Sequence, residues 1–122
     1  MKVQGVKGLP SIGVLRPEGP IDFRNVDALR AAAADGKRRG RRTLIVDLSD
    51  VRYINSFGMS ALLALSDDLS DAGGSLVLAA APPKLKVVLD LMGISAMLPM
   101  RGSVVSAVRS LVKRQPQRLG SR

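Results

Sequence analysis

Two short apolar segments that flank one amphipathic segment limit what the middle of this chain can fold into. Residues 44–48 and 76–78 are rich in aliphatic and β-branched side chains. Such runs are typical of strands that are buried on both faces of a sheet. Between them, apolar residues recur at helical spacing over residues 59–69, and the pair Gly73-Gly74 follows as a helix terminator. We therefore predict a parallel βαβ unit with a right-handed crossover over residues 43–82.

The loop that enters the predicted helix is the most informative part of this unit. Asn55-Ser56-Phe57-Gly58 follows the first strand at its carboxyl end and precedes the helix. Free backbone N–H groups and the helix dipole favour an anion there, so a phosphate would be well placed. Alternatively, Asn55 or Ser56 is simply the N-cap that satisfies one of those N–H groups. The residues alone leave both interpretations open.

The segment around this loop resembles the STAS domain of bacterial anti-sigma factor antagonists. That family has an apolar strand ending in Asp-Leu, a polar pair, an apolar pair, Asp-Ser-Ser-Gly-Leu-Gly and an apolar helix. Here the pattern reads VDLSDVRYINSFGMS at residues 46–60. The likeness continues through GGSLVL at 73–78 and PPKLKVVLDLMGI at 82–94, and Gly19-Pro20-Ile21-Asp22 is similar to the family's Gly-x-Leu-Asp. The resemblance covers most of the chain, from about residue 3 to residue 111.

The resemblance implies a regulatory protein-binding module and not an enzyme. In the family, the unphosphorylated protein captures an anti-sigma factor that is also a serine kinase of the histidine-kinase-like ATPase type, and this releases the sigma factor. Phosphorylation of the second hydroxyl residue in Asp-Ser-Ser-Gly ends the capture. A dianion in the middle of a contact surface opposes binding through repulsion and desolvation.

This chain departs from the family pattern at two positions. Asn55 replaces the aspartate, and Phe57 stands where the phosphorylated serine would be. Ser56 remains as the candidate phosphoacceptor, and Ser60, one turn into the helix, is less suited. An exposed Phe57 would be a favoured interface anchor, whereas a Phe57 that folds inward would belong to the core. The residues that we expect to bind the partner are Asp22, Asn55, Ser56, Phe57, Gly58, Met59 and Ser60.

Two other functions remain open for a fold of this kind, because one fold serves several roles. One is an adaptor that needs no phosphorylation, similar to the STAS subunits of ABC lipid-transport complexes or of stress-sensing assemblies, with an ABC ATPase as the partner. The other is a nucleotide-sensing domain like those appended to sulfate transporters.

Composition excludes several classes of chemistry. The chain has no cysteine and no histidine, so thiolate metal sites, the usual zinc ligand sets and a Ser-His-Asp triad cannot form. No G-x-x-x-x-G-K-[ST] motif is present, and we expect no cofactor and no metal. No apolar run approaches the roughly 18 residues of a membrane span, and no signal peptide is visible, so we expect a cytoplasmic protein.

The net charge of +9 at first suggests a nucleic-acid partner. Five of the 19 basic residues lie within residues 37–42 and four more lie after residue 112, and the remaining ten balance the ten acidic residues. Neither basic segment is interleaved with aromatic residues that could stack on bases. We therefore expect no direct nucleic-acid binding, and an accessory role for the basic loop and tail.

The flanking segments complete the predicted fold. Residues 3–15 predict a hairpin with its turn at 7–11 and its first strand at the sheet edge, and residues 23–34 a helix capped by Asp22 and ended by Gly36. A third helix would follow Pro83, and residues 97–100 would form an edge strand. The last helix would run from a cap at Ser103 to Val112.

These elements predict a single α/β STAS-like domain at residues 1–112, with a mixed sheet of four to five strands and about four helices. Residues 113–122 would form a basic, flexible tail.

Overall fold

A computed structural model describes residues 1–120, which form one five-stranded sheet, four α-helices and a short 3-10 helix. Neighbouring strands follow the order β1-β2-β3-β4-β5; β1 is antiparallel to β2, and all other pairs are parallel. The elements are β1 (Val3–Val6), β2 (Leu9–Leu15), α1 (Val26–Arg38), β3 (Thr43–Asp47), α2 (Ser56–Asp71), β4 (Ser75–Ala79), α3 (Pro83–Leu91), η1 (Ile94–Ala96), β5 (Met100–Arg101) and α4 (Val104–Gly120). The predicted α/β class and mixed sheet are confirmed.

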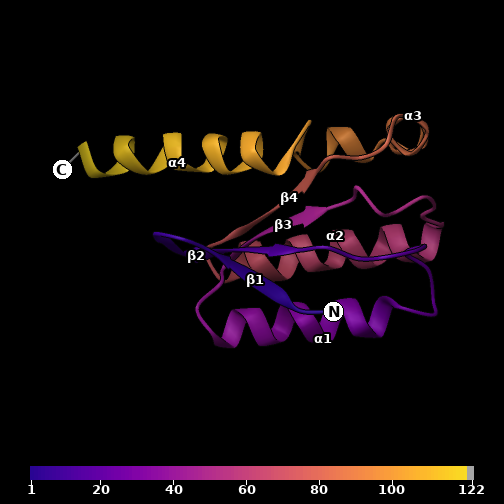
Figure 1. The fold of residues 1–122 in the computed structure, drawn as a ribbon, viewed down its shortest axis with the longest axis horizontal. Coiled ribbons are helices and arrows are strands. Elements are labelled where there is room, and N and C mark those ends of the chain that lie inside the picture. The colour runs from indigo at the N-terminus through magenta and orange to yellow at the C-terminus, as the bar shows by residue number, and fades with distance from the viewer. Residues whose placement is uncertain (121–122) are drawn as a thin grey trace.

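Helices cover both faces of the sheet. Figure 1 shows α4 on one side, and α1 and α2 on the other. Side chains alternate along β3, so Leu44 and Val46 belong to the core cluster with α1 and α2, whereas Ile45 packs with Ala107 of α4. All three β3 side chains are fully buried. This double burial is why the strand is a continuous apolar run in the sequence.

The predicted βαβ unit is confirmed. β3 and β4 pair in parallel from Thr43 with Ser75 to Asp47 with Ala79, and α2 connects them. Gly73 after α2 has a φ of 85°, which is the left-handed conformation expected of a helix terminator. A Cβ atom on Gly74 would lie 1.8 Å from the carbonyl oxygen of Arg42. The second glycine therefore allows α2 to return close to the start of β3.

The hairpin is also confirmed, with a shorter turn than predicted. β1 pairs with β2 and lies at the sheet edge, as the sequence indicates. The turn is Lys7-Gly8 with Gly8 at a φ of 78°, and β2 begins at Leu9. The prediction that the turn extends to Ser11 was wrong, because a two-residue turn with positive φ already reverses the chain.

The predicted bounds of the first helix were wrong at both ends. The helix starts at Val26 with Asn25 as its N-cap residue, because residues 23–25 form a hydrogen-bonded turn before it. Gly36 lies inside α1, where its missing side chain makes room for Val3 of β1. The chain leaves the helix after Arg38 and turns at Gly40, which has a φ of 87°.

The third helix and the last strand also differ from the prediction. α3 buries Leu85 and Leu89, while Val88 and Met92 are exposed, so the predicted four-residue apolar stripe was too wide. Gly93 ends the helix as predicted, with a φ of 80°. The strand predicted at residues 97–100 is only Met100–Arg101, because Leu98 is buried in the main core ahead of it.

Ser103 caps the last helix, as predicted. Its hydroxyl oxygen accepts the backbone N–H of Ser106 at 3.0 Å. The helix continues past Val112 to Gly120, so its backbone includes residues 113–120 of the segment predicted as a tail. Residues 121 and 122 lie outside the described residues. The division of the chain at residue 112 stays a prediction.

We predict that Leu62→Ala lowers the free energy of unfolding by about 2–5 kcal/mol, because Leu62 is 0% exposed in the core between α2 and the sheet. The matched control is Leu91→Ala on α3, where the side chain is 81% exposed and the change should stay within about 0.5 kcal/mol. Urea unfolding of both variants measures the difference. Equal losses would contradict the assignment of the two helix faces.

Candidate functional site

Two loops at the carboxyl edge of the parallel strands contain the predicted site residues. The first loop (residues 16–25) follows β2, and the second loop (residues 48–55) follows β3. Ile21 and Ile54 form a parallel bridge between the loops. The Ile21 N–H donates to the Tyr53 carbonyl oxygen at 2.9 Å, and the Asn55 N–H donates to the Ile21 carbonyl oxygen at 3.4 Å. Asp22 is thereby placed beside the start of α2, as the predicted site requires.

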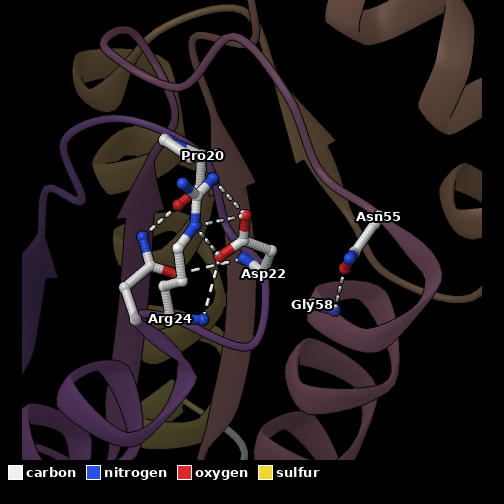
Figure 2. A network of polar contacts seen from close by, with 6 residues as sticks. Pro20, Asp22, Arg24, Asn55 and Gly58 are labelled. Atoms are coloured by element: carbon white, nitrogen blue, oxygen red, sulfur yellow. Dashed lines mark hydrogen bonds and ion pairs between the residues drawn. The ribbon is translucent and has the colours of Figure 1, made fainter.

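The second loop ends in the N-cap of α2. The Asn55 side-chain oxygen accepts the backbone N–H of Gly58 at 2.9 Å (Figure 2), so the predicted N-cap is confirmed. Ser56 and Phe57 are then the first two helical residues, and both are exposed. Phe57 is 54% exposed. The alternative in which Phe57 belongs to the core is therefore wrong.

The next residues of the predicted surface divide between solvent and core. Gly58 is buried against the first loop, where an added Cβ atom would lie 2.1 Å from the carbonyl oxygen of Ile21. Met59 is buried in the main core, and Ser60 is exposed. Met59 therefore cannot present its side chain to a partner without leaving the core, because helix periodicity turns it inward. The partner-binding role of the whole set stays a prediction.

The prediction that Asp22 caps α1 was wrong. Asp22 forms an ion pair with Arg24 instead (Figure 2). Asp22 is only 4% exposed. Its Oδ2 atom accepts from Arg24 Nη2 at 2.7 Å and Nε at 3.1 Å, and its Oδ1 atom accepts the Arg24 backbone N–H at 2.9 Å. The carboxylate therefore holds the first loop in place, and the predicted role of Asp22 in partner binding stays a prediction.

This ion pair changes the pKa of both groups. The Arg24 side chain, and then its backbone N–H, lower the pKa of Asp22 below 3.8, and burial opposes them only in part. The same hydrogen bond raises the pKa of the Arg24 guanidinium, and the nearby Tyr53 adds a smaller increase. Both groups are thus charged at neutral pH.

Asn25 completes the polar network of the first loop. Its side-chain oxygen accepts the Asp22 N–H at 3.0 Å, and its amide group donates to the carbonyl oxygen of Pro20. The sequence analysis missed Arg24 and Asn25 as site residues. The run Asp-Phe-Arg-Asn after Gly-Pro is a turn signal that could have indicated them.

The sequence analysis also missed Phe23 and Tyr53. Phe23 is 70% exposed on the first loop, and Tyr53 is 55% exposed on the second. Helical spacing had placed Phe23 on the inner face of α1, and the later start of that helix removes it from the core.

Comparison with known protein families identifies the family to which this chain belongs. A family model for the STAS domain matches residues 5–107, and the chain belongs to this family. It is similar to the candidate anti-sigma factor antagonist BtrV of Bordetella bronchiseptica, with 26% identity over 100 residues, which cover 82% of this chain and 86% of BtrV. Its relationship to anti-sigma factor antagonists, predicted from residues 46–60, is thus supported independently.

Solved structures support the same fold. A candidate anti-sigma factor antagonist of Thermotoga maritima matches with a TM-score of 0.77 and 20% identity, covering 88% of this chain and 91% of that one. The anti-sigma factor antagonist SpoIIAA in its unphosphorylated form matches with a TM-score of 0.67 and 18% identity, covering 92% and 96%. Bacillus SpoIIAA in its phosphorylated form matches with a TM-score of 0.65 and 20% identity, covering 89% and 98%. At these identities the structures establish the fold.

Within residues 1–120, no helix is long and apolar enough to cross a membrane. No cluster of three or more aspartate or glutamate side chains in the described part of the chain could hold a metal ion.

We predict that Gly58→Ala destabilises the protein by about 1–3 kcal/mol, because the new methyl group would collide with a backbone oxygen of the first loop. Alanine otherwise favours a helix by about 1 kcal/mol over glycine, so a loss would report the collision. Gly102→Ala is the matched control, because a Cβ atom there meets no described atom within 4 Å. Chemical unfolding of both variants measures the effect, and a neutral Gly58→Ala would contradict the close contact of the loops.

We predict that Arg24→Ala destabilises the protein at neutral pH and loses this effect in acid. The lowered pKa of Asp22 means that the ion pair stabilises the fold above the ordinary carboxyl pKa of 3.8, and that this contribution is lost as the pH falls through the folded-state pKa. The melting temperatures of the native protein and Arg24→Ala should therefore differ at pH values above 3.8 and converge as the pH is lowered further.

The control for this experiment is Arg39→Ala. Arg39 Nε lies 3.1 Å from Asp35 Oδ2, in a pair whose side chains are 72% and 48% exposed. Exposed pairs of this kind contribute little, so the melting temperature should change by a small amount at every pH. A constant loss for Arg24→Ala across the whole pH range would contradict a charge-dependent role for the Asp22 pair.

Proposed function

We propose that this protein is a regulatory module that captures an anti-sigma factor and is not released by phosphorylation of its contact loop. The single observation that carries this proposal is Phe57. It occupies the phosphoacceptor position of the family pattern and is exposed at the start of α2. A side chain without a hydroxyl group cannot accept a phosphoryl group, so the usual means of ending the capture is missing.

The relatives support the regulatory part of the proposal. BtrV and the Thermotoga protein are candidate anti-sigma factor antagonists, and the structure of SpoIIAA is known in unphosphorylated and phosphorylated forms. The partner would be an anti-sigma factor with a serine kinase of the histidine-kinase-like ATPase type. A partner of this kind acts in the cytoplasm, which is where the protein would work.

Ser56 is poorly placed to replace the missing acceptor. It is the first residue of α2, and side chains of successive helical residues point about 100° apart. A kinase that aligns the loop on residue 57 would therefore find the Ser56 hydroxyl pointing away from its phosphate donor. The neighbouring Asn55 side chain is held by its bond to Gly58, which resists a rotation of the loop toward the kinase.

The proposal does not require any catalytic group in this chain. The carboxylate of Asp22 is held by Arg24, and that of Asp47 accepts the Ser49 N–H at 3.0 Å and lies 3.9 Å from Arg16. Both therefore have structural partners at this edge of the sheet. A surface of exposed side chains on a rigid pair of loops suits binding better than acid or base chemistry.

We predict that the native protein is not phosphorylated at this loop, whereas Phe57→Ser is. The native protein, Ser56→Ala and Phe57→Ser should be incubated with the purified anti-sigma kinase of the same cell and ATP, and any phosphate mapped by mass spectrometry. Phosphate is expected only at residue 57 of Phe57→Ser. Once modified, that variant should lose the kinase in a gel-filtration assay, because a dianion enters the contact surface.

The three proteins separate the possible outcomes. Phe57→Ser without ATP controls for the loss of the aromatic side chain, and Ser56→Ala identifies any phosphate on the neighbouring hydroxyl. Stoichiometric phosphate on Ser56 of the native protein would overturn the absence of the switch. Failure of the unmodified native protein to bind the anti-sigma factor would overturn the capture itself.

A further inference from the structure

The distribution of aromatic residues in this structure is unusual. The chain has two phenylalanines, one tyrosine and no tryptophan. Phe23, Tyr53 and Phe57 are each more than half exposed, whereas the buried core is built from aliphatic residues and methionine. Aromatic side chains are normally major contributors to a core. When a protein has only three of them and exposes all three, their burial must be sought in a complex.

The three aromatic residues belong to the same part of the surface. Phe23 lies on the first loop, Tyr53 on the second loop, and Phe57 at the start of α2 directly after it. The Ile21 N–H to Tyr53 carbonyl bond and the Ile21–Ile54 bridge join these segments. The two isoleucines are buried, so the joint itself is part of the core. Phe23, Tyr53 and Phe57 therefore extend from backbone segments that are held together by hydrogen bonds and by buried side chains.

The polar network of the first loop fixes the backbone on both sides of Phe23. Phe23 lies between Asp22 and Arg24, whose side chains form the ion pair described above. The Asn25 N–H also donates to the Asp22 carbonyl oxygen at 3.2 Å, which closes the turn around Phe23. A side chain held in its binding orientation loses less conformational entropy on association. The network thus prepares Phe23 for a contact that it does not make within this chain.

The charges around the aromatic residues favour a protein partner over a nucleic acid. Single-stranded nucleic acid is bound by stacking aromatics inside a continuous basic groove. Here the basic segment 37–42 ends α1 and precedes β3, at the amino edge of the sheet, which is the opposite edge from the aromatic residues (Figure 1). Near the aromatic residues, the charge of Arg24 is paired with Asp22, whereas Arg52 is exposed. The two loops contain three basic and three acidic residues, and Glu18 and Asp50 are exposed as Arg52 is, so the loops have no net charge. An uncharged surface with exposed aromatic side chains fits apolar pockets on a protein.

We propose that Phe23, Tyr53 and Phe57 act together as the anchor of a protein-binding surface, whose partner is a protein with apolar pockets. Its identification with an anti-sigma factor rests on the function proposed above. The surface extends the predicted contact region from α2 onto the first loop. Phe57 then has a positive role, because an apolar anchor occupies the position at which the family pattern places its phosphoacceptor.

The affinity of the purified anti-sigma factor for single variants tests this surface. Phe23→Ala and Tyr53→Ala should each weaken binding at least about tenfold, as truncation of anchor residues does, with an unchanged melting temperature. Val105→Ala is the control, because Val105 is 60% exposed on α4, which covers the other face of the sheet. Its affinity should equal that of the native protein. Unchanged affinity of both aromatic variants would overturn the anchor.

A second experiment separates this inference from the proposed function. The photo-crosslinker p-benzoyl-L-phenylalanine is incorporated in the cell at position 23, 53 or 57, and at position 105 as a control. The expected result is one common protein adduct at the first three positions and none at the fourth. A common adduct other than an anti-sigma factor would overturn the proposed function but retain the surface. Absence of a common adduct would overturn the surface.

A third measurement decides between protein and nucleic acid. Native protein is titrated with a fluorescent single-stranded oligonucleotide at physiological salt. We expect no saturable binding, because the basic segment 37–42 and the aromatic residues lie at opposite edges of the sheet. Saturable binding that Phe23→Ala and Tyr53→Ala weaken would overturn the protein partner and assign the surface to nucleic acid.

Discussion

Burial of β3 on both faces is the constraint on which the rest of the structure depends. A strand that is apolar on both sides must be covered twice, by α1 and α2 on one face and α4 on the other. Parallel neighbours on each side then require crossover helices, which bring the carboxyl ends of β2, β3 and β4 to one edge. The candidate site is built from the two loops that follow β2 and β3 at this edge.

At that edge, a joint of backbone hydrogen bonds combines two loops into one surface. Ile21 and Ile54 insert into the core, and Gly58 lets the first turn of α2 approach the first loop closely. The Asp22–Arg24 pair and Asn25 then fix the remaining turn. A surface made in this way is stiff because its backbone is hydrogen-bonded and its apolar side chains are buried, so it is suited to recognition by preformed contacts.

Residue 57 has no hydroxyl group, and this affects how binding at the surface could be regulated. In the proposed function, a phosphorylated loop would repel a partner, whereas an exposed phenylalanine attracts one through burial of apolar area. In the proposed function, a phenylalanine at the phosphoacceptor position would exchange a reversible contact for a permanent one within the same STAS fold. Regulation would then fall to the amount of protein in the cell or to the partner.

The sequence by itself determined the βαβ unit and the family, because buried strands and the motif at residues 46–60 are local patterns, whereas it left the N-cap of α2 open between Asn55 and Ser56 and the structure decided for Asn55. It misplaced the start of α1 and the inner face of α3, since periodicity cannot tell which apolar residues find a neighbour. The exposure of Phe23 and the pairing of Asp22 with Arg24 were decided only by the tertiary structure. The first loop is joined to a second loop about thirty residues further along the chain, and no local pattern encodes a contact of that kind.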